Sequence, residues 1–178
     1  IRTFADVPEE GRFLQAGRSH TDARNGPIAA QAWFTYKCLT DLLEGAGSGL
    51  NDVVSATVYL QDLDDYHTFH EVHAHFFPDV HPAMTVTQFD EVGHRGTLIE
   101  IELTALRRTD GFDRKFIREA GALRPGAHCS LAAVAGPLIY ISGQAGCDVR
   151  GRAIEKPSDL LEEVRSTAAA LIRATGRP

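Results

Sequence analysis

The stretch DVVSATVYL, residues 52–60, decides the fold because it has the composition and the alternation of a β-strand. β-Branched residues favour strands, and successive side chains on a strand point to opposite faces. The alternation predicts one face made of Val54, Ala56, Val58 and Leu60 and another made of Val53, Ser55, Thr57 and Tyr59. We therefore expect a strand at this point of the chain.

Amphipathic helices are predicted on both sides of this strand. The helix before it begins at Pro27 and ends before Gly47, because proline suits a first helical turn and glycine a helix end. Its apolar positions recur at three and four residues, at Ala32, Leu39, Leu42, Leu43 and Ala46. After the strand, the acidic stretch DLDD at 62–65 caps a second helix, which carries HTFHEVHAHFF at 67–77 and ends at Pro78.

Further strands are predicted at 12–18, 83–89 and 97–105, and the glycines of DEVGHRG at 90–96 favour a turn between the last two. The order strand, helix, strand, helix, strand, strand indicates an α+β fold in which both helices cover one face of a mixed sheet. The other sheet face then needs a partner, so we expect a homo-oligomer.

An internal repeat divides the chain. AGRSHTDARNGPI at 16–28 aligns with SGQAGCDVRGRAI at 142–154, and an amphipathic helix at 160–176 follows the second copy. We expect a complete unit at 1–107, a linker and lead-in segment at 108–126, and the N-terminal half of a second unit at 127–178. Because a half-unit buries little apolar surface, it either docks on the first unit or belongs to a longer tandem protein, and we favour the longer protein.

Composition argues against several classes of partner. The chain has 178 residues, of which 43% are hydrophobic, and a formal net charge of -6. It has no basic run suited to a phosphate backbone and no apolar run near the roughly twenty residues of a membrane helix, so neither nucleic acid nor a membrane is expected. Cys38, Cys129 and Cys147 form no CxxC pair, which favours a reducing cytoplasm, and Cys38 is predicted in the helix core. No cofactor is expected.

The histidine-rich helix raises the question of a metal site. Helical periodicity directs Phe69, Val72 and Phe76 to the core and places His67 and His70 to one side, His73 at the edge of the core and His75 across the axis. No two of these histidines have the i, i+4 spacing of helical zinc ligands, and only pairs three residues apart could chelate. We therefore predict no metal, and prefer solvated or interface histidines.

Several spaced motifs resemble those of the Rid family, also called YjgF/YER057c/UK114. They are LLEGAG at 42–47, LNDVVSATVYLQDLDDY at 50–66, HFF at 75–77, PAM at 82–84, IEIELTAL at 99–106 and, in the second unit, LIYISGQAGCDVRG at 138–151. The resemblance implies a chorismate-mutase-like α+β fold and a trimer whose sheets form a central barrel, or a pseudo-trimer of units. It also implies small-molecule sites in the clefts between subunits.

The resemblance assigns the candidate site positions. In the family's enamine and imine deaminases, the arginine of a PAR motif holds the substrate carboxylate, and Met84 stands in that position. Glu100 corresponds to the glutamate that positions the attacking water, and His70, a side chain that titrates near neutral pH, stands where asparagine is usual. The other substrate-binding positions are Ala16, which replaces a serine, with Gly17 beside it, Cys129, where tyrosine is common, and Ser142, which is retained.

Two functional hypotheses follow. The first is a hydrolytic deaminase of enamine, imine or aminomuconate-type metabolites, in which Glu100 orients or deprotonates water, His70 transfers a proton and an arginine of another unit holds the substrate. Glu102 shares the strand face of Glu100, where two close carboxylates either raise one pKa or serve at an interface. The second hypothesis is a non-catalytic assembly or metabolite-binding unit whose partner half carries any active site, because methionine offers a carboxylate neither charge nor donor.

Overall fold

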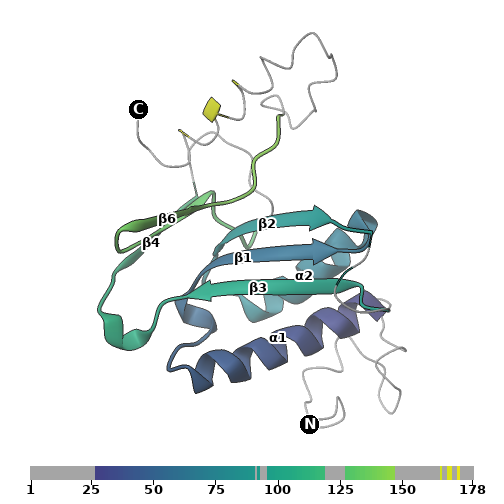
Figure 1. Ribbon diagram of the computed structural model, residues 1–178, viewed down its shortest axis with the longest axis horizontal. Coiled ribbons are helices and arrows are strands. Elements are labelled where there is room, and N and C mark those ends of the chain that lie inside the picture. Colours follow the sequence, from purple (N-terminus) through teal and green to yellow (C-terminus); the bar gives the residue numbers. More distant parts are fainter. Residues whose placement is uncertain are drawn as a thin grey trace.

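The computed structural model describes residues 27–90, 92, 96–118 and 127–146, together with positions 165, 168, 169 and 172. The strand predicted at 12–18 and Cys147 lie outside the described residues, as does the helix predicted at 160–176 except for those four positions. Within the described ranges the chain forms two α-helices and two three-stranded sheets, one in the order β2-β1-β3 and the other in the order β4-β5-β6 (Figure 1).

Both helices begin and end where the sequence predicts. Helix α1 (Pro27–Gly45) begins at proline and is followed by Gly47, whose φ of 76° is a left-handed conformation that glycine adopts without steric cost. Helix α2 (Tyr66–Phe76) follows a short turn capped by the side chain of Asp62 and ends before Pro78. The two predicted helices are therefore confirmed.

Strand β1 (Val53–Leu60) lies at the centre of the first sheet. β2 (Ala83–Gln88) runs parallel to β1, and β3 (Ile99–Ala105) runs antiparallel to it. β2 and β3 lie on opposite sides of β1. The connection between them therefore joins the two edges of this sheet and does not form a hairpin. Both helices cover one face of this mixed sheet (Figure 1), which confirms the predicted α+β architecture.

The face pattern of β1 differs from the prediction at its first two residues. The register shifts between Val53 and Ser55, which indicates a bulge or local irregularity in the strand. Val53 consequently joins the helix-side core with Ala56, whereas Val54 packs with Ala83 on the side of the second sheet. Strict alternation placed these two valines on the wrong faces because a bulge changes which side chains share a face.

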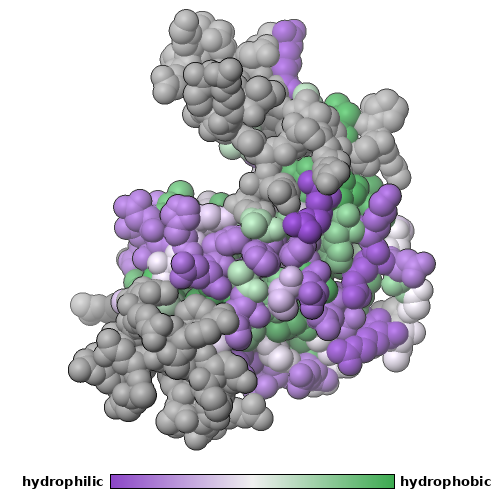
Figure 2. Space-filling model, turned by 180° about the vertical axis from the view of Figure 1, so that it is seen from behind, coloured by the Kyte–Doolittle hydropathy of each residue, from purple (hydrophilic) through white to green (hydrophobic). Residues whose placement is uncertain are grey.

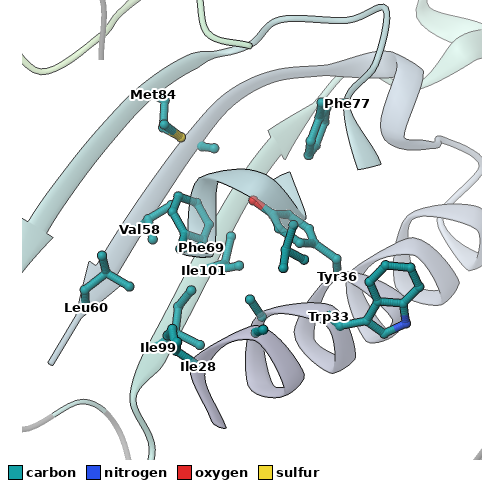
Figure 3. Packing of buried hydrophobic residues seen from close by; sticks show 14 of the residues in the cluster. Ile28, Trp33, Tyr36, Val58, Leu60, Phe69, Phe77, Met84, Ile99 and Ile101 are labelled. Carbon is teal, nitrogen blue, oxygen red and sulfur yellow. The ribbon is translucent and has the colours of Figure 1, made fainter. Parts of the chain in front are cut away.

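Aromatic side chains fill the space between the helices and the first sheet (Figure 3). Trp33 and Tyr36 come from α1 and Phe69 from α2, and each is at most 1% exposed. Phe76, predicted to face the core, is only partly buried, and Phe77 just after the helix is buried instead. Full burial of one large apolar side chain stabilises a fold by about 1.5–3 kcal/mol. Because this cluster contains most of the large buried side chains, it is the main hydrophobic contribution to the stability of the described residues.

The second sheet consists of short antiparallel strands. They are β4 (Arg114–Ile117), β5 (Ala132–Ala135) and β6 (Leu138–Ile141), and they lie beside β1 and β2 (Figure 1). Ala83 and Ser130 form a parallel bridge, so the segment before β5 continues the first sheet beyond β2. The described residues 127–146 thus pack against the first sheet, and the predicted division of the chain into one and a half units stays a prediction.

A partly buried aspartate fixes the passage from the first sheet to the second. The carboxylate of Asp52 pairs with Arg108 Nε at 2.9 Å and with Arg114 Nη1 at 3.2 Å, and its side chain is 12% exposed. Its backbone carbonyl accepts a hydrogen bond from Leu106 N at 3.0 Å. These contacts hold the chain on both sides of the turn that leads into β4.

The described surface is largely hydrophilic, but apolar side chains gather over the second sheet, on the right in Figure 2. Leu138 of β6 is 55% exposed. Cys38, predicted in the core, is exposed, because two residues after the buried Tyr36 it lies about 200° further around α1. In the described ranges no helix combines the length and hydrophobicity needed to cross a membrane.

Candidate functional site

Met84 lies on β2, the strand that borders the second sheet. Its side chain is fully buried and packs in the helix-side core with Val58 and Phe69 (Figure 3). Its backbone N–H donates to Ser142 Oγ at 2.8 Å, and its carbonyl accepts from Gly143 N at 3.2 Å. The position predicted to correspond to the carboxylate-binding arginine is thus hydrogen-bonded through both of its backbone groups to the loop at Ser142 and Gly143.

The hydroxyl of Ser142 joins three segments. It accepts from Met84 N and donates to Ser130 O, while the Ser130 hydroxyl donates to His81 O. Ser130 N donates to Pro82 O at 3.0 Å. Ser142 is 2% exposed, so these bonds satisfy polar groups that are buried where residues 130–143 pack against β2.

Cys129 reaches the same point from the lead-in to β5. Its side chain is fully buried, and its thiol donates to the sulfur of Met84 at an Sγ–Sδ distance of 3.8 Å. Sulfur groups of this kind are polarizable and pack well against apolar neighbours. In this arrangement Cys129 and Met84 are packing residues of the junction.

His70 lies on α2, close to the lead-in to β5. Its ring centroid is 6.0 Å from that of His128 and 5.8 Å from that of His73. Its Nε2 atom is buried and has no hydrogen-bond partner among the described residues. Burial, followed by the nearby His128 and His67, lowers the pKa of His70 from its ordinary value, so the imidazole is neutral at pH 7.

His73 is fully buried and does not lie at the edge of the core as predicted. It follows Phe69 by four residues and therefore lies on the same helical stripe, one turn further along. Its Nε2 lies 3.2 Å from His128 O, and because a carbonyl only accepts, Nε2 carries the proton. Nδ1 then accepts from the Tyr36 hydroxyl at 2.7 Å. Burial lowers the pKa of His73 to about 3, so it is neutral in the folded protein.

His128 is a residue of this junction that the sequence did not single out. Its Nδ1 lies 3.2 Å from Phe77 O, and because a carbonyl only accepts, Nδ1 carries a proton and donates to it. Its ring centroid is 5.4 Å from that of His81. The one sequence signal that could have indicated His128 was its place directly before Cys129, a position already assigned to the site.

Glu100 lies on the opposite face of the first sheet. It is exposed and in register with Tyr59, whereas its neighbours Ile99 and Ile101 are buried under the helices. Glu102 shares the exposed face, as predicted, and its Oε2 accepts from the Tyr59 hydroxyl at 3.5 Å. Within one chain the structure places Met84 in contact with Cys129 and Ser142, puts His70 beside His128, the residue before Cys129, and leaves Glu100 apart from them.

The first copy of the loop, with Ala16 and Gly17, lies outside the described residues. In the part of the chain that the structure describes, no group of three or more histidine, cysteine, aspartate or glutamate side chains is placed to hold a metal ion. For the whole chain the absence of a metal stays a prediction.

Residues 11–107 match the family model described as Endoribonuclease L-PSP, the YjgF/UK114 family. The chain belongs to this family. The matched range ends where the sequence predicts the end of the first unit, and the resemblance inferred from the spaced motifs is confirmed.

Relatives of this YjgF/UK114 family member include named deaminases. A RutC family protein of Pyrococcus horikoshii is 32% identical over 113 residues, which are 60% of this chain and 89% of that protein. The human 2-iminobutanoate/2-iminopropanoate deaminase is 31% identical over 83 residues, 47% of this chain and 60% of the relative. The Salmonella typhimurium protein of the same name is 29% identical over 101 residues, 53% of this chain and 79% of the relative.

Solved structures of the family also align with the chain. The YjgF gene product of E. coli is 29% identical, with a TM-score of 0.45, and the alignment covers 53% of this chain and 72% of that one. A YjgF/YER057c/UK114 family member from Mycobacterium tuberculosis is 32% identical, with a TM-score of 0.43 and coverage of 44% and 66%.

Proposed function

We propose that this YjgF/UK114 family protein is a hydrolytic deaminase that acts on small imines or enamines, a class that includes aminomuconate-type metabolites. Water adds to the C=N carbon, ammonia leaves, and a carbonyl remains, so 2-iminobutanoate would give 2-oxobutanoate and ammonia. Family membership supports the proposal, as do relatives from Homo sapiens and Salmonella typhimurium that are named deaminases of 2-iminobutanoate and 2-iminopropanoate.

The observation that carries this proposal is the junction at Met84. The loop at Ser142 and Gly143 hydrogen-bonds to both backbone groups of Met84, and His70 lies near His128 at the same boundary. Site positions from the first unit therefore meet site positions from the second unit inside one chain. We propose that residues 127–178 serve as the first half of a second copy, which completes this site.

The proposal also includes a homo-oligomer. Glu100 and His70 face opposite sides of the sheet in one chain, so a single chain does not place both of them beside one substrate. A second copy that brings its open sheet face to the junction would supply the glutamate that orients water, while His70 exchanges a proton. A trimeric barrel or a pseudo-trimer of units provides such an arrangement, and the cytoplasm is the compartment that we propose for it.

A non-catalytic binding or assembly unit is the second candidate, and one observation favours it. Met84 and Cys129 are fully buried, and their sulfur atoms are in contact. A side chain enclosed in this way cannot act as the wall of an open pocket without a rearrangement of the second unit. In this case the partner half of a longer protein would carry any active site.

The test is the hydrolysis of freshly generated 2-iminobutanoate by the whole chain, measured as imine loss above the spontaneous rate. We expect acceleration, and we expect Glu100→Gln to lower it by about 100-fold or more, which is the usual contribution of general acid–base catalysis. Glu102→Gln is the matched control, since Glu102 lies on the same strand and the same exposed face. This control should retain the rate within a few-fold.

One result would count against the deaminase itself, namely a wild-type rate equal to the spontaneous rate, and it would favour the non-catalytic unit. Equal losses in the two glutamate variants, or a full rate in Glu100→Gln, would leave the deaminase in place but reject the specific role of Glu100.

A further inference from the structure

We propose that His70 and His128 together bind the carboxylate of the substrate, in place of the arginine whose position Met84 occupies. The inference rests on the proposed function and names the group that recognises the substrate's charge. It gives the proton exchange of His70 a specific partner, the substrate carboxylate.

The positions of the two imidazoles suit one carboxylate. His70 comes from α2 of the first unit and His128 from the lead-in to β5 of the second, and their ring centroids are 6.0 Å apart, with the rings inclined at 55°. Charge-assisted N–H···O bonds are about 2.7–2.9 Å long, and in the proposed site the two rings turn toward one carboxylate so that each donates to one of its oxygens. Met84 offers no such bond, because a thioether carries neither a charge nor a donor.

Both rings have a nitrogen that suits this role. Nε2 of His70 is buried and has no hydrogen-bond partner within the described ranges, which is costly for a polar atom unless a ligand completes it. Nδ1 of His128 donates to Phe77 O, so Nε2 is the ring nitrogen left to donate to an anion. Because burial keeps His70 neutral in the empty protein, an incoming carboxylate would bind together with a proton taken from solvent.

The surroundings determine the direction of this proton coupling. In the empty protein burial lowers the pKa of His70, and the neighbouring His128 and His67 lower it further. A carboxylate between the rings has the opposite effect, since a nearby negative charge stabilises the imidazolium. Binding should therefore tighten as the pH falls toward 6.

The titratable and charged groups around the pair are Tyr66, His67, Glu71 and His73 on α2, His81 beside His128, and Arg118 at the end of β4. Burial raises the pKa of Tyr66 to about 12, so its hydroxyl stays neutral. Glu71 is exposed and, as the residue after His70, lies about 100° around the helix from it. Arg118 Nη2 donates to Ala127 O at 3.0 Å, which places a permanent positive charge one residue from His128.

The experiment is isothermal titration of the whole chain with 2-oxobutanoate, the carboxylate product of the proposed reaction. Titrations at pH 7.5 and 6.5, each in two buffers of different ionisation enthalpy, measure both Kd and the protons taken up. We expect proton uptake and a Kd that falls by up to about tenfold over that pH unit. His70→Gln and His128→Gln should each raise Kd by about tenfold or more and reduce the uptake, because a hydrogen bond to a charged group is lost.

His75→Gln is the matched control. His75 lies on the same helix but stacks on Trp33 of α1, at a centroid distance of 4.6 Å, and should leave both Kd and proton uptake unchanged. An unchanged Kd in His70→Gln and His128→Gln, or wild-type binding without proton uptake, would overturn the inference even if imine hydrolysis were observed. Proton-coupled binding by wild type that is lost in both variants, without any hydrolysis, would support the carboxylate site and reject the deaminase.

Discussion

The sharpest consequence of the fold concerns His73, which we expect to make the protein less stable as the pH falls from 7 to 5. Its pKa in the folded protein is lowered to about 3, against an ordinary value of 6.5, because it is buried between the helices. Between these two values the unfolded chain binds a proton that the folded protein excludes, so stability is complete above pH 6.5 and is lost toward pH 3. From pH 7 to pH 5 the loss is about 2 kcal/mol for this one side chain.

The assay is urea unfolding at pH 7 and pH 5, followed by the fluorescence of the single tryptophan, Trp33, which is 1% exposed. In His73→Gln, whose amide can still accept from the Tyr36 hydroxyl, the difference between the two pH values should shrink by about 2 kcal/mol. His67→Gln is the control, because His67 is exposed on the same helix, and it should keep the wild-type difference. An equal pH difference in wild type and His73→Gln would refute the buried neutral histidine.

Three further predictions concern the junction and the assembly. Met84→Arg should lower the free energy of unfolding in urea by about 3 kcal/mol or more, because it buries an uncompensated guanidinium. Met84→Leu should lower it by less than about 1.5 kcal/mol. Equal stability of the two variants would mean that position 84 opens to solvent. Ser142→Ala should cost about 1–3 kcal/mol, since it leaves Met84 N and Ser130 O without the hydroxyl that joins them, and an unchanged unfolding midpoint would contradict the docking seen here. Light scattering at micromolar concentration should give an oligomer, and a stable monomer would exclude the barrel assembly.

The sequence was sufficient for the local elements of the first unit. Proline at the start of α1, the left-handed Gly47 after it and the acidic turn before α2 act within a few residues, so their effect can be predicted from the order of residues alone. The alternation in β1 likewise predicted which side chains are buried from Ala56 onward. The motifs that run through these elements were enough to indicate the family.

Tertiary structure decided the features that depend on how distant segments pack. Cys38 and His73 were misplaced because helical periodicity gives relative angles, while the face that is buried depends on where α1 and α2 meet. Val53 and Val54 were misplaced because the irregularity in β1 arises from its pairing with β3.

The candidate site shows the same division between sequence and structure. Sequence motifs named Met84, Ser142 and Cys129, but only packing shows that a loop 58 residues after Met84 hydrogen-bonds to it. That Glu100 and His70 lie on opposite sides of a sheet could not be predicted, since the position of α2 relative to β3 depends on which face of the sheet the helices cover. The sequence by itself therefore determined which chemical groups the chain carries. The long-range pairing of strands determined which of these side chains can meet, because contacts between distant segments follow from burial of the shared core and not from local order.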